Sequence, residues 1–195
     1  IDRGDFGGGT SANSAKIVHG GIRSLQSGNL VALRSFVRER RALLRIAPHL
    51  VHPLPFVIPT YKGTRGRFAM QAAFSLYDLL ANDRNDSLGR SKHLSPSRCI
   101  SRDECLALNT VISAKGVTGG VIWFDCQMHN ADRIVLSFVM SAVGANAVAA
   151  NYVEATDWIR EGNRITGVRV QDRLSADRFD VRATLTVNAM GPWSP

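Results

Sequence analysis

The sequence lacks two features that would place it in a class at once. It has no run of eighteen or more apolar residues, which excludes a hydrophobic membrane-spanning helix. Cysteine is scarce, because Cys99, Cys105 and Cys126 are the only three and form no C-x-x-C spacing. An odd number of cysteines in this arrangement favours reduced thiols in a cytoplasmic setting. We therefore expect no metal site.

Acidic residues are also in deficit. The chain of 195 residues holds 24 Lys and Arg against 16 Asp and Glu, a formal net charge of +8 at pH 7. This balance favours anionic partners such as phosphates, nucleic acid or lipid headgroups, and it does not choose between them. No zinc-finger spacing and no aromatic platform for bases occurs, so nucleic acid is not an expected partner.

The two ends lack the usual marks of natural termini. The chain begins with Ile1 rather than Met, shows no secretory pattern, and ends at Pro195. These features predict an internal fragment of a longer protein.

What the chain does have is a stretch rich in glycine and small polar residues, residues 5–23. It contains Gly7 to Gly9 and, after His19, the pair Gly20-Gly21. Glycine lets the backbone approach another group closely or turn through positive φ. Hydroxyl residues ahead of a helix start can serve as an anion site. On composition alone a capped glycine-rich loop is the favoured explanation, although the flat backbone at Gly20-Gly21 would suit a planar ring.

The order of residues in this stretch carries a more specific signal. Asp5-Phe-x-x-Gly-Thr-Ser-x-x-Ser-x-Lys-x-x-His-Gly-Gly-x-Arg23 resembles the flavin-binding signature of FAD-dependent glycerol-3-phosphate dehydrogenases, which belong to the D-amino-acid-oxidase-like flavoproteins. Residues 38–56, 124–133 and 187–193 resemble later segments of that family, in the same order. Four signatures in order over nearly the whole chain make the resemblance strong.

The resemblance implies FAD as the cofactor. It implies cofactor contacts from Asp2, Thr10, Ser11, Ser14, Lys16, His19, Gly20, Gly21 and Gly191. Asp2 would end a strand and bind ribose hydroxyls, although no G-x-G-x-x-G turn is found in this sequence. Arg23 and His19 are the implied catalytic residues, and the planar fork of an arginine suits a phosphate.

The sequence departs from the family pattern after Arg23. The family usually has an aromatic residue there, and Ser24 stands in its place. Further along, Asp125, His129 and Arg133 surround a turn that we interpret as capped by Asn130.

The implied fold is α/β. An incomplete FAD-binding Rossmann-like domain with a β-meander would comprise residues 1–47 and 130–195, and an inserted mixed α+β substrate domain residues 48–129. Periodicity and breakers predict helices over 14–25, 30–47, 68–81, from 101 with a capping box of Ser101 and Glu104, and over 130–143, the last one buried. They predict an edge-type strand with three prolines over 51–61, and strands over 117–124, 147–153, 157–160, 164–171 and 178–189, with a turn at Gly162-Asn163. The resemblance implies that the last strand is a returning parallel strand.

The resemblance also implies an activity. It is the oxidation of sn-glycerol 3-phosphate to dihydroxyacetone phosphate, with electrons passed to a quinone or another acceptor. A different alcohol or amine substrate, or a catalytically silent fragment that retains FAD poorly, are the alternatives. A basic helix face, formed by Arg34, Arg38, Arg41 and Arg45, is either solvated or in contact with the inner face of the cytoplasmic membrane.

Overall fold

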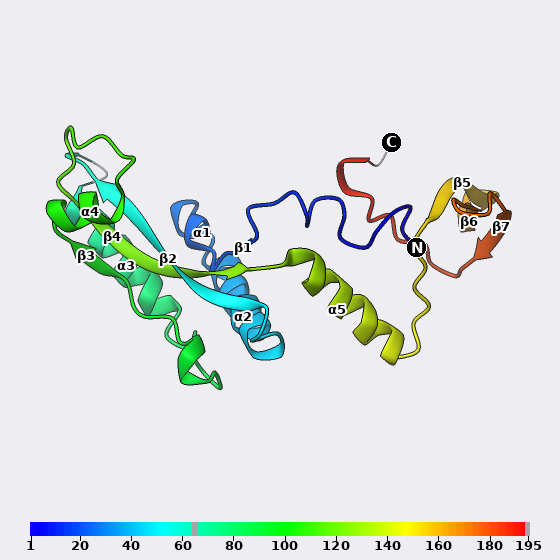
Figure 1. The fold of residues 1–195 in the computed structure, drawn as a ribbon, viewed down its shortest axis with the longest axis horizontal. Coiled ribbons are helices and arrows are strands. Elements are labelled where there is room, and N and C mark those ends of the chain that lie inside the picture. The colour runs from blue at the N-terminus through cyan, green and yellow to red at the C-terminus, as the bar shows by residue number, and fades with distance from the viewer. Residues whose placement is uncertain (64–65, 194–195) are drawn as a thin grey trace. The chain divides into compact units, whose positions relative to one another are not determined.

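The computed structural model describes residues 1–63 and 66–193 (Figure 1). The chain divides into two compact units. We call Ser14–Ile134 the sheet unit, and Ile1–Asn13 together with Val135–Pro195 the meander unit. Each unit is described by itself.

The sheet unit is built on two long antiparallel strands, β2 (Val51–Thr60) and β4 (Gly119–Met128). They pair over their whole length, from Val51 opposite Met128 to Thr60 opposite Gly119. The short strands β1 (Ile17–Val18) and β3 (Arg98–Ile100) also pair with β4. β2 therefore lies at the sheet edge, where its three prolines cost no ladder hydrogen bonds. The predicted edge strand over 51–61 is confirmed.

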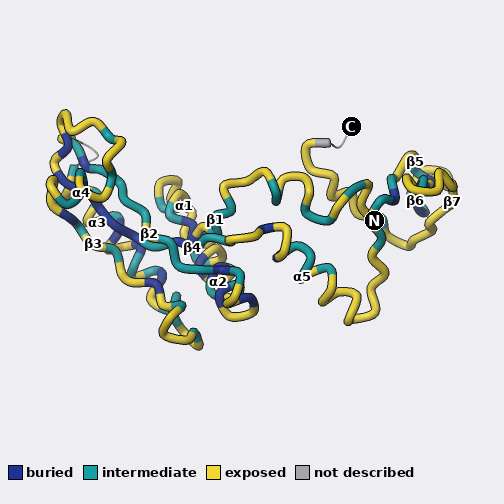
Figure 2. The backbone as a smooth tube through the Cα atoms, in the orientation of Figure 1, coloured by how far each residue is buried: buried dark blue, intermediate teal, exposed yellow. Residues whose placement is uncertain are grey.

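The helices of the sheet unit cover both faces of β4. They are α1 (Ile22–Gln26), α2 (Leu30–Ile46), α3 (Arg67–Leu80) and α4 (Arg102–Leu108), with a short 3-10 turn η1 (Arg90–Lys92). Trp123 packs on Phe74 of α3, whereas the next residue along the pleat, Ile122, packs on Cys105 of α4. Figure 2 shows the resulting buried stretch along β4. A strand buried on both faces forms the centre of this unit.

The meander unit contains a three-stranded antiparallel sheet. Its strands are β5 (Val153–Glu161), β6 (Arg164–Asp172) and β7 (Arg178–Arg182). Gly162-Asn163 forms the two-residue turn between β5 and β6, as predicted, and Gly162 has a positive φ of 60°. The unit ends in a short turn, η2 (Gly191–Trp193).

The predicted helix over 14–25 is wrong. Residues 17 and 18 instead pair with β4 as β1, and only residues 22–26 are helical. Lys16 has a positive φ of 58°, which no α-helix accommodates. A tertiary strand pairing therefore overrides the local helical pattern.

Two predictions in the C-terminal half also need correction. The strand expected over 147–153 begins only at Val153, and the one expected over 178–189 ends at Arg182 and pairs antiparallel rather than parallel. Helix α5 (Ala131–Gly144) is present, but Phe138 and Met140 are exposed. Its predicted burial is wrong for this chain, because the described residues do not cover these side chains.

No helix among residues 1–63 and 66–193 is long and apolar enough to cross a membrane. The domain boundaries inferred from the family resemblance stay a prediction.

Candidate functional site

The site is built on the turn His19-Gly20-Gly21, which connects β1 to α1. The Gly20 N–H donates to Oδ1 of Asp125 at 2.7 Å, and the Gly20 carbonyl accepts from the Tyr77 hydroxyl at 3.2 Å. A Cβ at this position would overlap the guanidinium of Arg40 and the Tyr77 hydroxyl. Position 20 therefore accepts only glycine without a shift of these buried groups.

Gly21 is required for a different reason. Its φ is 79°, in the left-handed region, and a Cβ there would lie 2.9 Å from Cβ of Phe36. A left-handed residue directly before α1 allows the chain to turn from β1 into the helix over the three residues 19–21.

A buried ion pair lies beneath this turn. The side chains of Arg40 on α2 and Asp125 on β4 are each 1% exposed, and Nη1 of Arg40 pairs with Oδ1 of Asp125. The same nitrogen donates to the Phe124 carbonyl at 3.1 Å, whereas Nε and Nη2 of Arg40 make no hydrogen bond among the described residues. Such a pair is costly to break, because the remaining charge would stay buried without a partner.

The electrostatics of the pair are consistent with its charged form. Burial acts to lower the pKa of Arg40, but the buried Asp125 carboxylate acts in the opposite direction, and the pKa is raised. Burial also raises the pKa of the Tyr77 hydroxyl, which stays protonated as the donor to Gly20. Burial raises the pKa of the Cys126 thiol to about 12, so this cysteine is no nucleophile at neutral pH.

His19 lies on the exposed side of the turn. Its Nδ1 is 3.2 Å from Oδ2 of Asp125, and its side chain is 59% exposed. The carboxylate of Asp125 thus contacts a backbone amide, an arginine and an imidazole at once. This arrangement fixes the turn and orients the histidine ring.

The other site residues predicted in the sheet unit lie on the same short segment. Ser14 Oγ accepts the Lys16 N–H at 3.1 Å, and the Lys16 carbonyl accepts from the Met128 N–H at 2.7 Å. Arg23 is exposed on α1. The structure therefore places Lys16, His19 and Gly20 beside residues 125–128 of β4, with Arg23 on the helix that follows them.

The remaining predicted residues belong to the meander unit. Asp2 donates its N–H to the Ala150 carbonyl and accepts from the Val153 N–H, each at 2.9 Å, and its Oδ1 accepts from the Gly4 N–H. Thr10 is exposed and Ser11 half-buried in a turn-rich segment. Gly191 has a φ of 61° and begins η2.

Arg40 and Tyr77 were not among the predicted site residues, and no role was predicted for Asp125. A signal for Arg40 was present, because it falls on the helical stripe of Leu33, Val37 and Leu44, all of which are buried. A charged residue within an apolar stripe requires a buried partner. Asp125 lies 85 positions further along the chain, and no local pattern connects the two.

The basic face of α2 is solvated only in part. Arg34 and Arg41 both pair with Asp83, at 2.6 and 2.9 Å, whereas Arg38 and Arg45 are exposed. The Arg34 hydrogen bond is the main reason that the pKa of Asp83 is lowered. Of the four arginines, two are therefore held in ion pairs and two are exposed to solvent.

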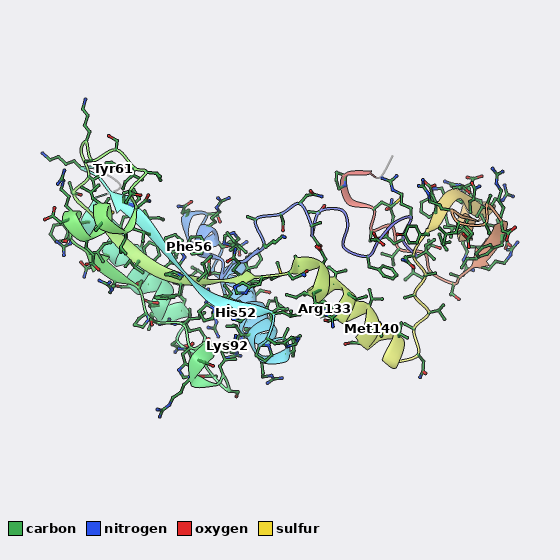
Figure 3. All side chains as sticks on the ribbon, viewed as in Figure 1. His52, Phe56, Tyr61, Lys92, Arg133 and Met140 are labelled. Atoms are coloured by element: carbon green, nitrogen blue, oxygen red, sulfur yellow. The ribbon has the colours of Figure 1, made fainter. Side chains whose placement is uncertain are left out.

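The turn after β4 is capped as predicted, because the Arg133 N–H donates to Oδ1 of Asn130 at 2.9 Å. His129 before it stacks on His52, with ring centroids 4.2 Å apart. Nζ of Lys92 lies 3.1 Å from Nδ1 of His52, and Figure 3 labels His52, Lys92 and Arg133. These contacts fix the turn.

Comparisons with known proteins identify the family of this chain. The model of the FAD dependent oxidoreductase family matches residues 1–195. The chain therefore belongs to this family, and the predicted family and mixed α/β fold are confirmed.

Two similar proteins within this family are named for their activity. A "Glycerol-3-phosphate dehydrogenase" of Synechocystis sp. is 36% identical over 197 residues, covering 99% of this chain and 34% of that protein. An "Alpha-glycerophosphate oxidase" of Streptococcus pyogenes serotype M18 is 33% identical, covering 100% and 31%. The chain thus spans about a third of the length of these relatives.

Solved structures share the fold. The glycerol-3-phosphate dehydrogenase from Bacillus halodurans, complexed with FAD, aligns with a TM-score of 0.60 and 21% identity over 93% of this chain and 27% of that one. The L-proline dehydrogenase from P. horikoshii aligns with a TM-score of 0.58 and 13% identity over 87% and 41%.

Proposed function

We propose that the protein is an FAD-dependent dehydrogenase that oxidises the C2 alcohol of sn-glycerol 3-phosphate to the ketone, giving dihydroxyacetone phosphate. The observation that carries this proposal is the His19-Gly20-Gly21 turn, clamped by Asp125 and flanked by the cations Lys16 and Arg23. The names of the relatives, glycerol-3-phosphate dehydrogenase and alpha-glycerophosphate oxidase, support the substrate.

The donor set of this segment fits FAD. Gly20 and Gly21 present backbone without side chains, and Lys16 supplies an ammonium group for an anionic ligand. Within the sheet unit, the residues that would hold the cofactor are Ser14, Lys16, His19, Gly20 and Gly21. In the meander unit, Asp2, Thr10, Ser11 and Gly191 stay predictions from the family resemblance. FAD, when bound, would supply the hydride acceptor for the oxidation of C2.

Two side chains would act on the substrate. The exposed guanidinium of Arg23 binds the phosphate group, because it can offer two parallel N–H donors to phosphate oxygens. His19 accepts the proton of the C2 hydroxyl, since a neutral imidazole has one ring nitrogen with a free lone pair.

The electrons then pass to a quinone or another acceptor. A position at the inner face of the cytoplasmic membrane fits the net charge of +8 and the exposed Arg38 and Arg45. In this proposal residues 1–47 and 130–195 belong to an FAD-binding domain, and residues 48–129 to a substrate domain.

A second candidate is the oxidation of a different alcohol or amine. Ser24 favours it, because the resembled family usually has an aromatic residue at that position beside the substrate arginine. A third is that the 195 residues alone are inactive and retain FAD poorly.

Anaerobic addition of glycerol 3-phosphate to the complete natural protein that contains this chain tests the proposal. We expect the visible absorbance of oxidised flavin to disappear. Arg23→Met should raise the substrate concentration needed for half-reduction about 100-fold, through lost charge-assisted hydrogen bonds. Arg45→Met, a change at an exposed arginine on α2, is the matched control and should leave that concentration unchanged. Bleaching by other alcohols or amines but not by glycerol 3-phosphate would favour the second candidate, and a colourless protein would refute the flavin assignment.

A further inference from the structure

We propose that Asp125 is a positioning residue for His19, holding its ring in the tautomer that carries the proton on Nδ1 and leaves Nε2 as the proton acceptor. This inference rests on the proposed function, which places His19 at the reacting alcohol.

The chemistry of the contact between His19 and Asp125 determines which ring nitrogen carries the proton. Nδ1 of His19 lies 3.2 Å from Oδ2 of Asp125. An ionised carboxylate accepts hydrogen bonds and has none to donate. Nδ1 must therefore be the donor, and in a neutral imidazole the lone pair then belongs to Nε2.

The orientation of the Asp125 carboxylate is fixed by its other contacts. Its side chain is 1% exposed, and its Oδ1 accepts from both the Gly20 N–H and Arg40. These two bonds hold the carboxylate plane, so Oδ2 stays directed at His19. The same side chain thereby fixes the backbone beside the histidine and the ring itself.

Nε2 of the His19 ring is the nitrogen left for a ligand. Among the described residues, Asp125 is the one hydrogen-bond partner found for the His19 ring, and the side chain is 59% exposed. Nε2 lies across the ring from Nδ1 and can meet a ligand. The charged and titratable groups around the hydrogen bond between His19 and Asp125 include Arg40 from α2, Tyr77 from α3 and Asp125 itself from β4.

These points define the role in the reaction. The O–H bond of the C2 hydroxyl breaks, and its proton goes to Nε2 of His19, giving an imidazolium. Asp125 then faces a positive ring and stabilises it. The hydride leaves C2 as described above, so charge and atoms balance.

The alternative is that Asp125 only holds Gly20 and Arg40 in place. Asp125→Asn removes the carboxylate from both His19 and Arg40, so its effect is read together with a double-mutant cycle, which separates the two roles. The amide oxygen can still accept from Gly20, but the amide nitrogen would offer an N–H to Nδ1 and favour the opposite tautomer. We expect kcat/KM of the complete natural protein to fall about 100-fold. Asp83→Asn, which removes another arginine-paired carboxylate of the sheet unit, should leave kcat/KM unchanged.

A double-mutant cycle is the deciding kinetic test. If Asp125 acts through His19, Asp125→Asn causes no further loss in the His19→Gln background. An equal loss in both backgrounds would show a structural role and overturn the inference.

A spectroscopic readout does not depend on activity or on a variant that folds poorly. Nitrogen-15 NMR of the native protein should show the His19 ring protonated at Nδ1 and unprotonated at Nε2 at a pH where the ring is neutral. The opposite tautomer would overturn the inference. If the native protein does not oxidise glycerol 3-phosphate, the proposed function fails, and this measurement still decides whether Asp125 sets the tautomer.

Discussion

The glycine-rich stretch is held by different means on the two sides of Asn13. In the meander unit, residues 5–13 bond mainly to one another, as in Gly8 N–H to the Asp5 carbonyl and Ala12 N–H to the Gly7 carbonyl. In the sheet unit, Gly20 bonds to Asp125 and Tyr77, residues far away in sequence. Similar composition therefore produces a locally folded loop in one place and a turn fixed by a buried network in the other.

The same contrast holds for the cores. The buried cluster of the meander sheet consists of Val153, Val168 and Val170, and every residue of β7 is exposed. The sheet unit buries β4 on both faces and includes a charged pair in its interior. We expect substitutions to be costly where contacts are long-range and buried, and mild where they are local and exposed.

Breaking the buried pair should have the largest effect. Arg40→Met leaves the Asp125 carboxylate buried without its arginine, and the expected loss is about 3–5 kcal/mol of unfolding free energy in the sheet unit. Arg45→Met on the exposed face of the same helix should cost no more than about 0.5 kcal/mol. Denaturant unfolding of the complete natural protein, followed by fluorescence, measures both. Equal costs would mean that the Arg40 pair is not the buried network described here.

A smaller loss of stability is expected from alanine substitutions that compare the two glycine-rich segments. Gly20→Ala would force Cβ into Arg40 and Tyr77, and overpacking of this kind costs about 1–3 kcal/mol. A Cβ at position 8 of the meander unit would lie 3.2 Å from the Asp5 carbonyl oxygen and 3.8 Å from Cβ of Asp5, and one at position 89 would meet nothing within 4 Å. Thermal unfolding of the three variants should rank Gly20→Ala lowest by a clear margin. A Gly8→Ala protein as unstable as Gly20→Ala would remove the contrast.

The Asp83 pair should show a modest effect that depends on pH. The Arg34 hydrogen bond lowers the pKa of Asp83 in the folded state, so the pair stabilises the fold above the unfolded pKa of about 4 and loses this contribution as pH falls through the lower folded value. Asp83→Asn should cost about 0.5–1 kcal/mol at pH 7 and progressively less below about pH 4. A cost that does not change with pH would contradict the ion-pair explanation.

The smallest expected effect is on thiol reactivity. Burial raises the pKa of Cys126 to about 12, and Cys105 is buried as well, whereas Cys99 is half-buried. Iodoacetamide at pH 8 should therefore modify Cys99 first and leave Cys126 untouched until the sheet unit unfolds. Mass spectrometry of peptides gives the order, and early labelling of Cys126 would mean that β4 is less protected than the structure indicates.

Much of the fold could be predicted because its signals are local. Ser101 accepts from the Glu104 N–H as the capping pattern predicts, and the prolines of β2 mark an edge strand. The strand at Ile17–Val18 could not be predicted, because its partner on β4 is more than a hundred positions away. The same distinction holds for the site. Its glycines and cations could be predicted because they belong to one sequence motif, whereas the ion pair of Arg40 and Asp125 forms only on folding.

The most direct measurement is a crystal structure of the complete natural protein with FAD bound. We expect the flavin ring to lie against the backbone of Gly20-Gly21, with Asp125 still hydrogen-bonded to the Gly20 N–H and to Nδ1 of His19. A flavin ring bound away from this turn, or a turn released from Asp125, would contradict it.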